Sequence, residues 1–92
     1  MAHTFDELVA MQRAADQAHN RVEELRNQYG SPAHTSWTKG QSATYETAWR
    51  AWRDLDRDAR LAVTEYAKDQ GTSRREVEDA LRQAVRHPEA ET

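Results

Sequence analysis

The sequence predicts an all-α protein, with a long antiparallel helical hairpin of coiled-coil-like pattern and a short third helix near the C-terminus. Two stretches place apolar or small side chains at alternating spacings of three and four residues, which lie on one side of an α-helix. The first stripe is Leu8, Met11, Ala15, Ala18, Val22, Leu25 and Tyr29, and the second is Tyr45, Ala48, Trp52, Leu55, Ala59, Ala62 and Tyr66. Neither stripe fits a strand, because alternate residues of a strand point to opposite faces.

The first helix is expected over residues 5–29. Thr4 and Glu7 have the spacing of a capping box, in which each residue satisfies a backbone N–H group of the other. Gly30 can adopt the left-handed conformation that commonly ends a helix. Residues 30–37 are then expected to form a loop.

The second helix is expected over residues 38–70 and the third over residues 73–87, with a frayed tail at 88–92. Their start signals are Thr38 with Gln41, or Ser42 as the alternative, for the second helix, and Ser73 with Glu76 for the third. Gly71 separates the two helices. Together with the first helix, they make a single helical domain over residues 1–92.

The short loop between the long helices makes them antiparallel neighbours. With Tyr29 opposite Tyr45, large side chains meet small ones at most levels, as a close-packed core requires. The other expected pairs are Leu25 with Ala48, Val22 with Trp52, Ala18 with Leu55, Ala15 with Ala59, Met11 with Ala62, and Leu8 with Tyr66. This pairing favours a hairpin within one molecule. The alternative is that each helix dimerises separately.

The third helix has one apolar face that needs a surface to cover it. This face is formed by Val77, Ala80, Leu81, Ala84 and Val85. We expect it to fold back on apolar residues that lie off the main stripes at the same end of the hairpin, namely Phe5, Val9, Leu61 and Val63.

Composition narrows the class of protein. The formal net charge is −3 and there is no cysteine, so neither a general attraction to nucleic acid nor a disulfide framework is expected. Leu, Ile, Val and Phe supply only 11 of 92 residues, so the core must be thin or shared with a partner. No signal peptide or membrane span is evident, and we expect a soluble, cytoplasmic protein.

Two patterns raise the possibility of a metal site. Asp54, Asp56, Asp58 and Glu65 have the spacing of calcium ligands in an EF-hand loop, but Ala59 stands where that loop needs glycine. The helical stripe also continues through this segment, so we expect a solvated helix face with ion pairs such as Glu46–Arg50 and Asp56–Arg60. The four histidines, His3, His19, His34 and His87, are scattered, and no metal, cofactor or catalytic residue is expected.

The corner between the second and third helices resembles a helix-turn-helix DNA-binding motif of the phage-repressor type. Ala67, Gly71 and Val77 have its spacing, and this resemblance implies that Arg74, Arg75 and Arg82 would contact DNA. Five basic and four acidic side chains are mixed between positions 68 and 86, which favours protein binding over DNA binding.

The tryptophans suggest a protein interface. Trp37 lies in the expected loop and Trp49 lies off the stripe of its helix, as does Leu61. Because tryptophan is enriched where proteins bind each other, these three residues are the candidate interface. We therefore expect a non-enzymatic interaction or adaptor protein that binds a protein partner or forms a homodimer. The alternative is a small DNA-binding or accessory regulator that uses residues 63–87.

Overall fold

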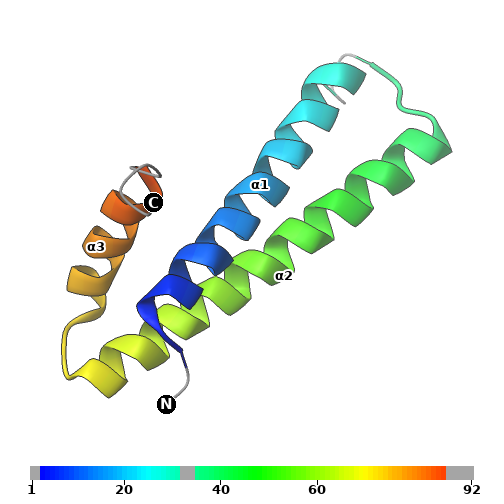
Figure 1. The fold of residues 1–92 in the computed structure, drawn as a ribbon. Helices are drawn as coiled ribbons and strands as arrows, with labels where there is room; N and C mark the ends of the chain where they lie inside the picture. The colour runs from blue at the N-terminus through cyan, green and yellow to red at the C-terminus, as the bar shows by residue number, and fades with distance from the viewer. Residues whose placement is uncertain (1–2, 32–34, 87–92) are drawn as a thin grey trace.

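The computed structural model describes residues 3–31 and 35–86, which form three α-helices (Figure 1). They are α1 (Phe5–Tyr29), α2 (Lys39–Gln70) and α3 (Arg74–Arg86). α1 and α2 run antiparallel and side by side, and α3 folds back beside them. The all-α hairpin with a short third helix is therefore confirmed. None of these helices is long and apolar enough to cross a membrane within the described residues.

Both long helices begin at the expected capping boxes. The Thr4 hydroxyl accepts a hydrogen bond from the Glu7 N–H, and the Glu7 carboxylate accepts one from the Thr4 N–H, both at 3.1 Å. Thr38 and Gln41 exchange the same two bonds at 3.1 and 2.9 Å, so Thr38 rather than Ser42 is the cap of α2. These bonds satisfy N–H groups that have no partner within the helix.

The corner between α2 and α3 is set by a left-handed glycine. Gly71 has φ 64° and ψ 31°, and its N–H donates to the carbonyls of Ala67 and Lys68. The Thr72 N–H also donates to the Ala67 carbonyl, which completes a Schellman motif. Ser73 then caps α3 by accepting a hydrogen bond from the Glu76 N–H at 3.1 Å. The expected end of this helix at His87 and the tail lie outside the described residues.

The three helices share one apolar core at the end of the hairpin away from its loop. Its buried members are Leu8, Val9, Ala62, Val63, Ala67, Val77 and Leu81, with Phe5 and Tyr66 packed against them. Phe5 and Tyr66 stack with ring centroids 6.1 Å apart. α3 therefore covers Phe5, Val9 and Val63, as expected.

The expectation that α3 also covers Leu61 is wrong. Leu61 is 58% exposed. Val63 follows it by two residues, which is a rotation of about 200° around the helix. The two side chains therefore point in nearly opposite directions, and α3 can cover only one of them.

The half of the hairpin next to the loop is only two helices thick. Its buried side chains are Val22 and Leu25, and the buried alanines Ala15 and Ala59 lie just beyond the middle of the hairpin. Leu55 lies on the predicted stripe but is 38% exposed, so α1 does not fully cover it. The half next to the loop therefore buries little apolar area.

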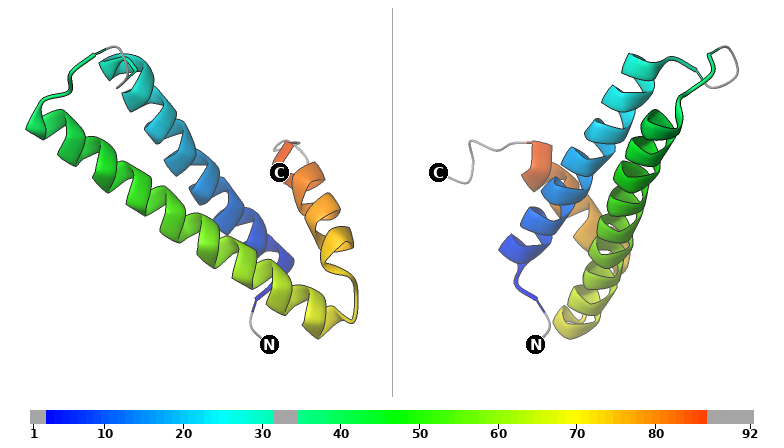
Figure 2. Two further views of the ribbon diagram at one scale, coloured as in Figure 1. Left: turned by 180° about the vertical axis from the view of Figure 1, so that it is seen from behind. Right: turned by 90° about the vertical axis from the view of Figure 1, so that its right-hand side faces the viewer.

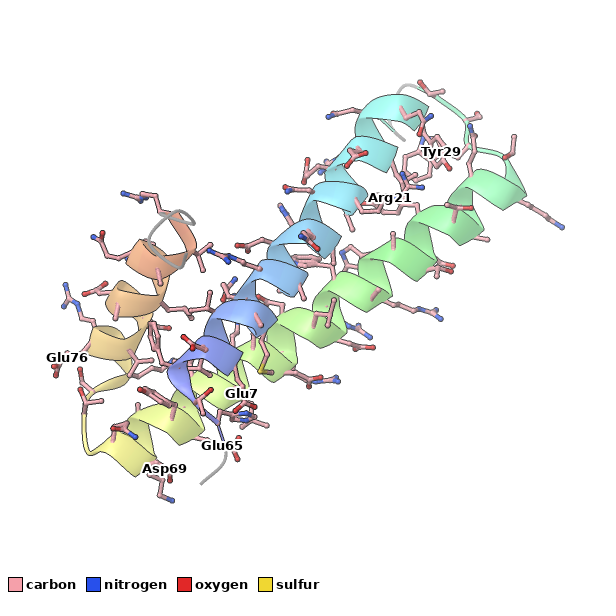
Figure 3. All side chains as sticks on the ribbon, in the orientation of Figure 1. Glu7, Arg21, Tyr29, Glu65, Asp69 and Glu76 are labelled. Carbon is pink, nitrogen blue, oxygen red and sulfur yellow. The ribbon has the colours of Figure 1, made fainter. Side chains whose placement is uncertain are left out.

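Trp37 closes the loop end of the hairpin. Its ring lies between Tyr29 and Tyr45, with centroid distances of 5.5 and 4.9 Å. Its indole N–H donates to the Gly30 carbonyl at 3.0 Å. The tyrosines expected to face each other are thus bridged by a tryptophan, and Figure 3 shows Tyr29 at this end of α1.

Replacing Leu25 by alanine should destabilise the protein by about 2–5 kcal/mol, because its side chain is 1% exposed and the cavity has little else to fill it. Leu61→Ala is the matched control and should change stability by no more than about 0.5 kcal/mol. Urea denaturation followed by circular dichroism at 222 nm measures both. Equal effects would contradict the described packing of the hairpin.

Gly71→Ala should cost about 1–2 kcal/mol, because an L-residue is disfavoured in the left-handed conformation at this corner. A Cβ atom there would meet no atom within 4 Å, so the loss would come from the backbone alone. The control is Gly40→Ala, which should stabilise α2 by about 0.5–1 kcal/mol. Thermal unfolding distinguishes the two, and a neutral Gly71→Ala would argue against the left-handed cap.

Candidate interaction surface

α3 lies on one side of the hairpin, which we call the α3 face. Figures 1 and 2 show α3 beside the half that holds the start of α1 and the end of α2. Its 13 residues span about 20 Å, whereas the 32 residues of α2 span about 48 Å. The half of the α3 face next to the loop is therefore not covered by a third helix in the described part of the chain.

A groove of about 540 Å³ lies where α3 meets the hairpin. Its apolar lining is Val63, Leu81 and Val85. Its polar and charged lining is Gln12, Asp16, Asp56, Arg60, Arg74, Glu78, Arg82 and Arg86. An apolar floor with charged edges of both signs is the chemistry of a protein-binding surface, where a polar rim surrounds an apolar centre.

The charges around the groove are mostly paired within the chain. Arg60 Nε lies 2.9 Å from the Asp56 carboxylate, and Arg74 Nε lies 3.1 Å from that of Glu78. The third pair joins Arg82 Nη1 to Asp79 at 3.2 Å. These exposed pairs contribute little to stability, but they keep the groove close to neutral.

The helix positions that line the groove repeat along α1 and α2 toward the loop. Trp49 precedes Ala67 by 18 residues, or five full turns, so both residues lie on the same side of α2. His19 and Glu23 each follow a groove residue of α1 by seven residues, which keeps them near its line. We call this surface the loop-proximal patch. It comprises His19, Glu23, Glu46, Trp49, Trp52 and Arg53.

Aromatic rings form the centre of the loop-proximal patch. The rings of His19 and Trp52 lie against each other across the two helices, with centroids 4.8 Å apart. Trp49 is 38% exposed, and the Arg53 guanidinium lies 4.9 Å from the centre of its ring. Arginine above an exposed tryptophan is a weakly attractive cation–π contact. It leaves part of the indole open to a partner.

The three candidate interface residues do not form one surface. Trp37 is packed between Tyr29 and Tyr45 at the loop end, whereas the ring of Trp49 contacts Arg53. Leu61 lies twelve residues after Trp49, which is about 18 Å along α2 and 120° around it. Leu61 therefore points away from the α3 face.

Four residues were not expected on the surface that contains Trp49, namely His19, Glu23, Glu46 and Arg53. The sequence does contain a signal for them, because they lie at helical spacings from the residues of α1 and α2 that line the groove at α3. That signal can be used only once the side of the hairpin on which α3 lies is known.

Of the two expected ion pairs, Glu46–Arg50 does not form, whereas Asp56–Arg60 does. Within residues 3–31 and 35–86, Glu46 has no ion-pair partner.

Two of the three arginines of the helix-turn-helix interpretation are engaged by their own helix. Arg74 contacts Glu78 and also donates a hydrogen bond to the Thr64 hydroxyl of α2 at 3.0 Å. Arg82 pairs with Asp79, while Arg75 is exposed. Acidic partners within one turn reduce the attraction of this helix for phosphate.

The segment with calcium-ligand spacing is continuous helix inside α2. Asp54 and Asp58 both lie close to Arg57, at 3.5 and 3.6 Å, in place of wrapping a cation. His19 pairs with Glu23 at 3.6 Å. No group of three metal-ligating side chains occurs in the part of the chain that is described, and His34 and His87 lie outside it.

A smaller hollow lies between α1 and α2 near the loop. It is lined by Arg21, Leu25, Ala43, Thr44, Thr47 and Ala48. Arg21 extends from α1 in this region in Figure 3. Because Leu25 and Ala48 line the same hollow, they lie at one level of the hairpin.

His3, Glu7 and Glu65 meet where the start of α1 approaches the end of α2. The two ring nitrogens of His3 lie 4.0 Å from Glu7 and 3.5 Å from Glu65, and Figure 3 shows both glutamates at this end. Hydrogen bonds from the Thr4 backbone and side chain lower the pKa of Glu7, and the charge of His3 lowers it further. The cluster thus favours the ionised carboxylate at the helix start.

The ionised Glu7 should stabilise the fold above its ordinary pKa of about 4.5, and this contribution should be lost as the pH falls through the lower pKa of the folded state. Glu7→Gln keeps a side-chain oxygen that can accept the hydrogen bond from the Thr4 N–H but removes the charge. The stability difference between wild type and Glu7→Gln should therefore be largest near pH 7 and shrink toward zero near pH 3. Thermal unfolding at several pH values measures it, and a constant difference would contradict the assigned role.

Comparison with known proteins gives no match: no family model, curated protein or solved structure is significantly similar to this chain. The function is therefore inferred from the chemistry of the α3 face alone.

Proposed function

We propose that this protein is a non-enzymatic, cytoplasmic interaction module that binds a protein partner through the loop-proximal patch. The supporting observation is that α3 covers one half of the α3 face and leaves the other half with a partly exposed tryptophan. The covered half of the α3 face shows that an amphipathic helix can pack against it. There, Val77 and Leu81 of an amphipathic helix are buried against α1 and α2.

The composition of the patch suits a protein interface. Tryptophan and arginine dominate the residues on which binding energy concentrates, and both occur here as Trp49 and Arg53. Trp52 is already half-buried against His19, so a partner would find one ring fixed in place. A fixed aromatic side chain loses little conformational entropy on binding.

The groove extends the same surface. Asp16 and Asp56 line the groove and lie next to the patch along their helices. A partner helix that covers the patch would reach the open end of the groove. Both regions have apolar centres with charges of both signs at their edges, as expected for a partner that carries charges of both signs itself.

A photo-crosslinking residue at position 49 tests this proposal in cells that express the protein. We expect covalent adducts with protein from position 49 and few or none from position 61. Position 61 is the matched control because Leu61 is more exposed, at 58% against 38% for Trp49, so exposure alone would favour it. Adduct mass gives the size of the captured partner.

Two outcomes would contradict the proposal. Equal adduct yields at positions 49 and 61 would show non-specific contact, and an absence of adducts at position 49 would show that the patch is unused. A second crosslinker at position 53 provides an independent measurement on the same patch.

A further inference from the structure

We infer that the partner is a second copy of this chain, joined to the first across a twofold axis through the loop-proximal patch. This inference rests on the proposed function and assigns the occupant of its surface. The two hairpins would lie face to face and antiparallel, so that their loop-proximal halves form a short four-helix bundle. Each contact between two different residues would then occur twice in the dimer, because the two copies exchange roles across the axis.

The charges of α2 are arranged for such pairing. Glu46 and Arg53 lie seven residues apart on the α3 face, with Trp49 between them. Reversing the direction of α2 about a point near Trp49 places Glu46 opposite Arg53 of the second copy, and Arg53 opposite its Glu46. The two indole rings of Trp49 would then meet close to the axis. Glu46 has no ion-pair partner among the described residues of its own chain, so it is available for this contact.

α1 carries a second pair of charges that fits the same axis. Arg26 follows His19 by seven residues, so it lies on the same side of α1 at the edge of the patch. Glu23 and Arg26 lie three residues apart, and reversal about their midpoint places each opposite the other in the second copy. Their midpoint is next to Leu25, and Trp49 is next to Ala48. Leu25 and Ala48 line one hollow of the hairpin, so both reversal points lie at one level. A single twofold axis therefore satisfies both helices.

α3 limits how far such a second copy can extend. Reversal about a point near Trp49 places Lys39 of the second copy opposite Arg60, and Arg60 lines the groove together with the last turn of α3. The antiparallel second copy would therefore reach the open end of the groove, next to α3. A parallel pair would bring the two α3 helices to the same place. In the antiparallel arrangement, the overlap includes the region in which Val22 and Leu25 are the buried side chains.

The expected affinity follows from the size of the overlap. The two reversal points place residues 39–60 of α2 and 20–29 of α1 opposite the second copy, which gives a footprint of about 24 by 20 Å on each copy, or about 1,000 Å² in total. This is at the low end of specific protein interfaces, so we expect a reversible dimer with a Kd in the micromolar range. The Glu46–Arg53 contact occurs twice, and its loss is therefore counted twice.

Sedimentation velocity of the purified chain from about 1 to 200 µM tests the inference with three variants. Glu46→Arg and Arg53→Glu each place like charges together, and each should weaken the dimer about tenfold or more. The double variant restores opposite charges and should return the Kd to within about threefold of wild type. Arg75→Glu, on the exposed side of α3, is the matched control and should leave the Kd unchanged. Circular dichroism checks that helix content is retained.

The outcomes separate this inference from the proposed function. A monomer at all concentrations, together with adducts of another mass from position 49, would overturn the second copy while supporting the interaction module. A dimer that Glu46→Arg and Arg53→Glu leave unchanged would place the contact elsewhere and also overturn the inference. Rescue by the double variant supports both the occupant and its antiparallel orientation.

Discussion

The seam between α1 and α2 determines the rest of the structure. Alanine at positions 15, 59 and 62 lets the two helices approach closely, but each alanine buries little apolar area. A two-helix stretch with such a seam is weakly held. The half away from the loop gains α3 and with it a core that contains Leu8, Val63 and Leu81. The loop half gains only the edge-to-face packing of Trp37 against its neighbouring tyrosines. The difference between the two halves leaves one half of the α3 face uncovered.

The fold was predictable because each of its signals is local or periodic. A capping box is read from two residues three apart, and both boxes at the starts of α1 and α2 form as expected. The seam between α1 and α2 is predicted from the spacing of apolar and small residues, and of these residues only Leu55 is exposed. Its exposure depends on how fully α1 covers it, which spacing alone does not contain. The error at Leu61 has the same origin, since closeness in sequence to Val63 was taken for a shared face.

The candidate interaction surface was less predictable, because it depends on where α3 ends. Trp49 could be recognised as lying off the seam, but not as lying on the side that α3 covers further along. His19 was considered only as a possible metal ligand, whereas its ring packs against Trp52. Such a contact joins residues 33 positions apart, and no spacing rule relates them. The DNA-binding interpretation shows the same limit, because Arg74 and Arg82 looked available until their acidic neighbours were placed.

The mismatch in length between α3 and the hairpin also bears on the affinity of the proposed dimer. If α3 were long enough to cover the whole face, the patch would be buried and the chain would be a closed three-helix bundle. If α3 were absent, the whole face would be open, and a second copy would be needed for a stable core. With half of the face covered, the core around Leu8 and Val77 can fold within one molecule. In the proposed dimer, the loop-proximal half would gain its third and fourth helices from the second copy, and the small area of this contact would keep the affinity low.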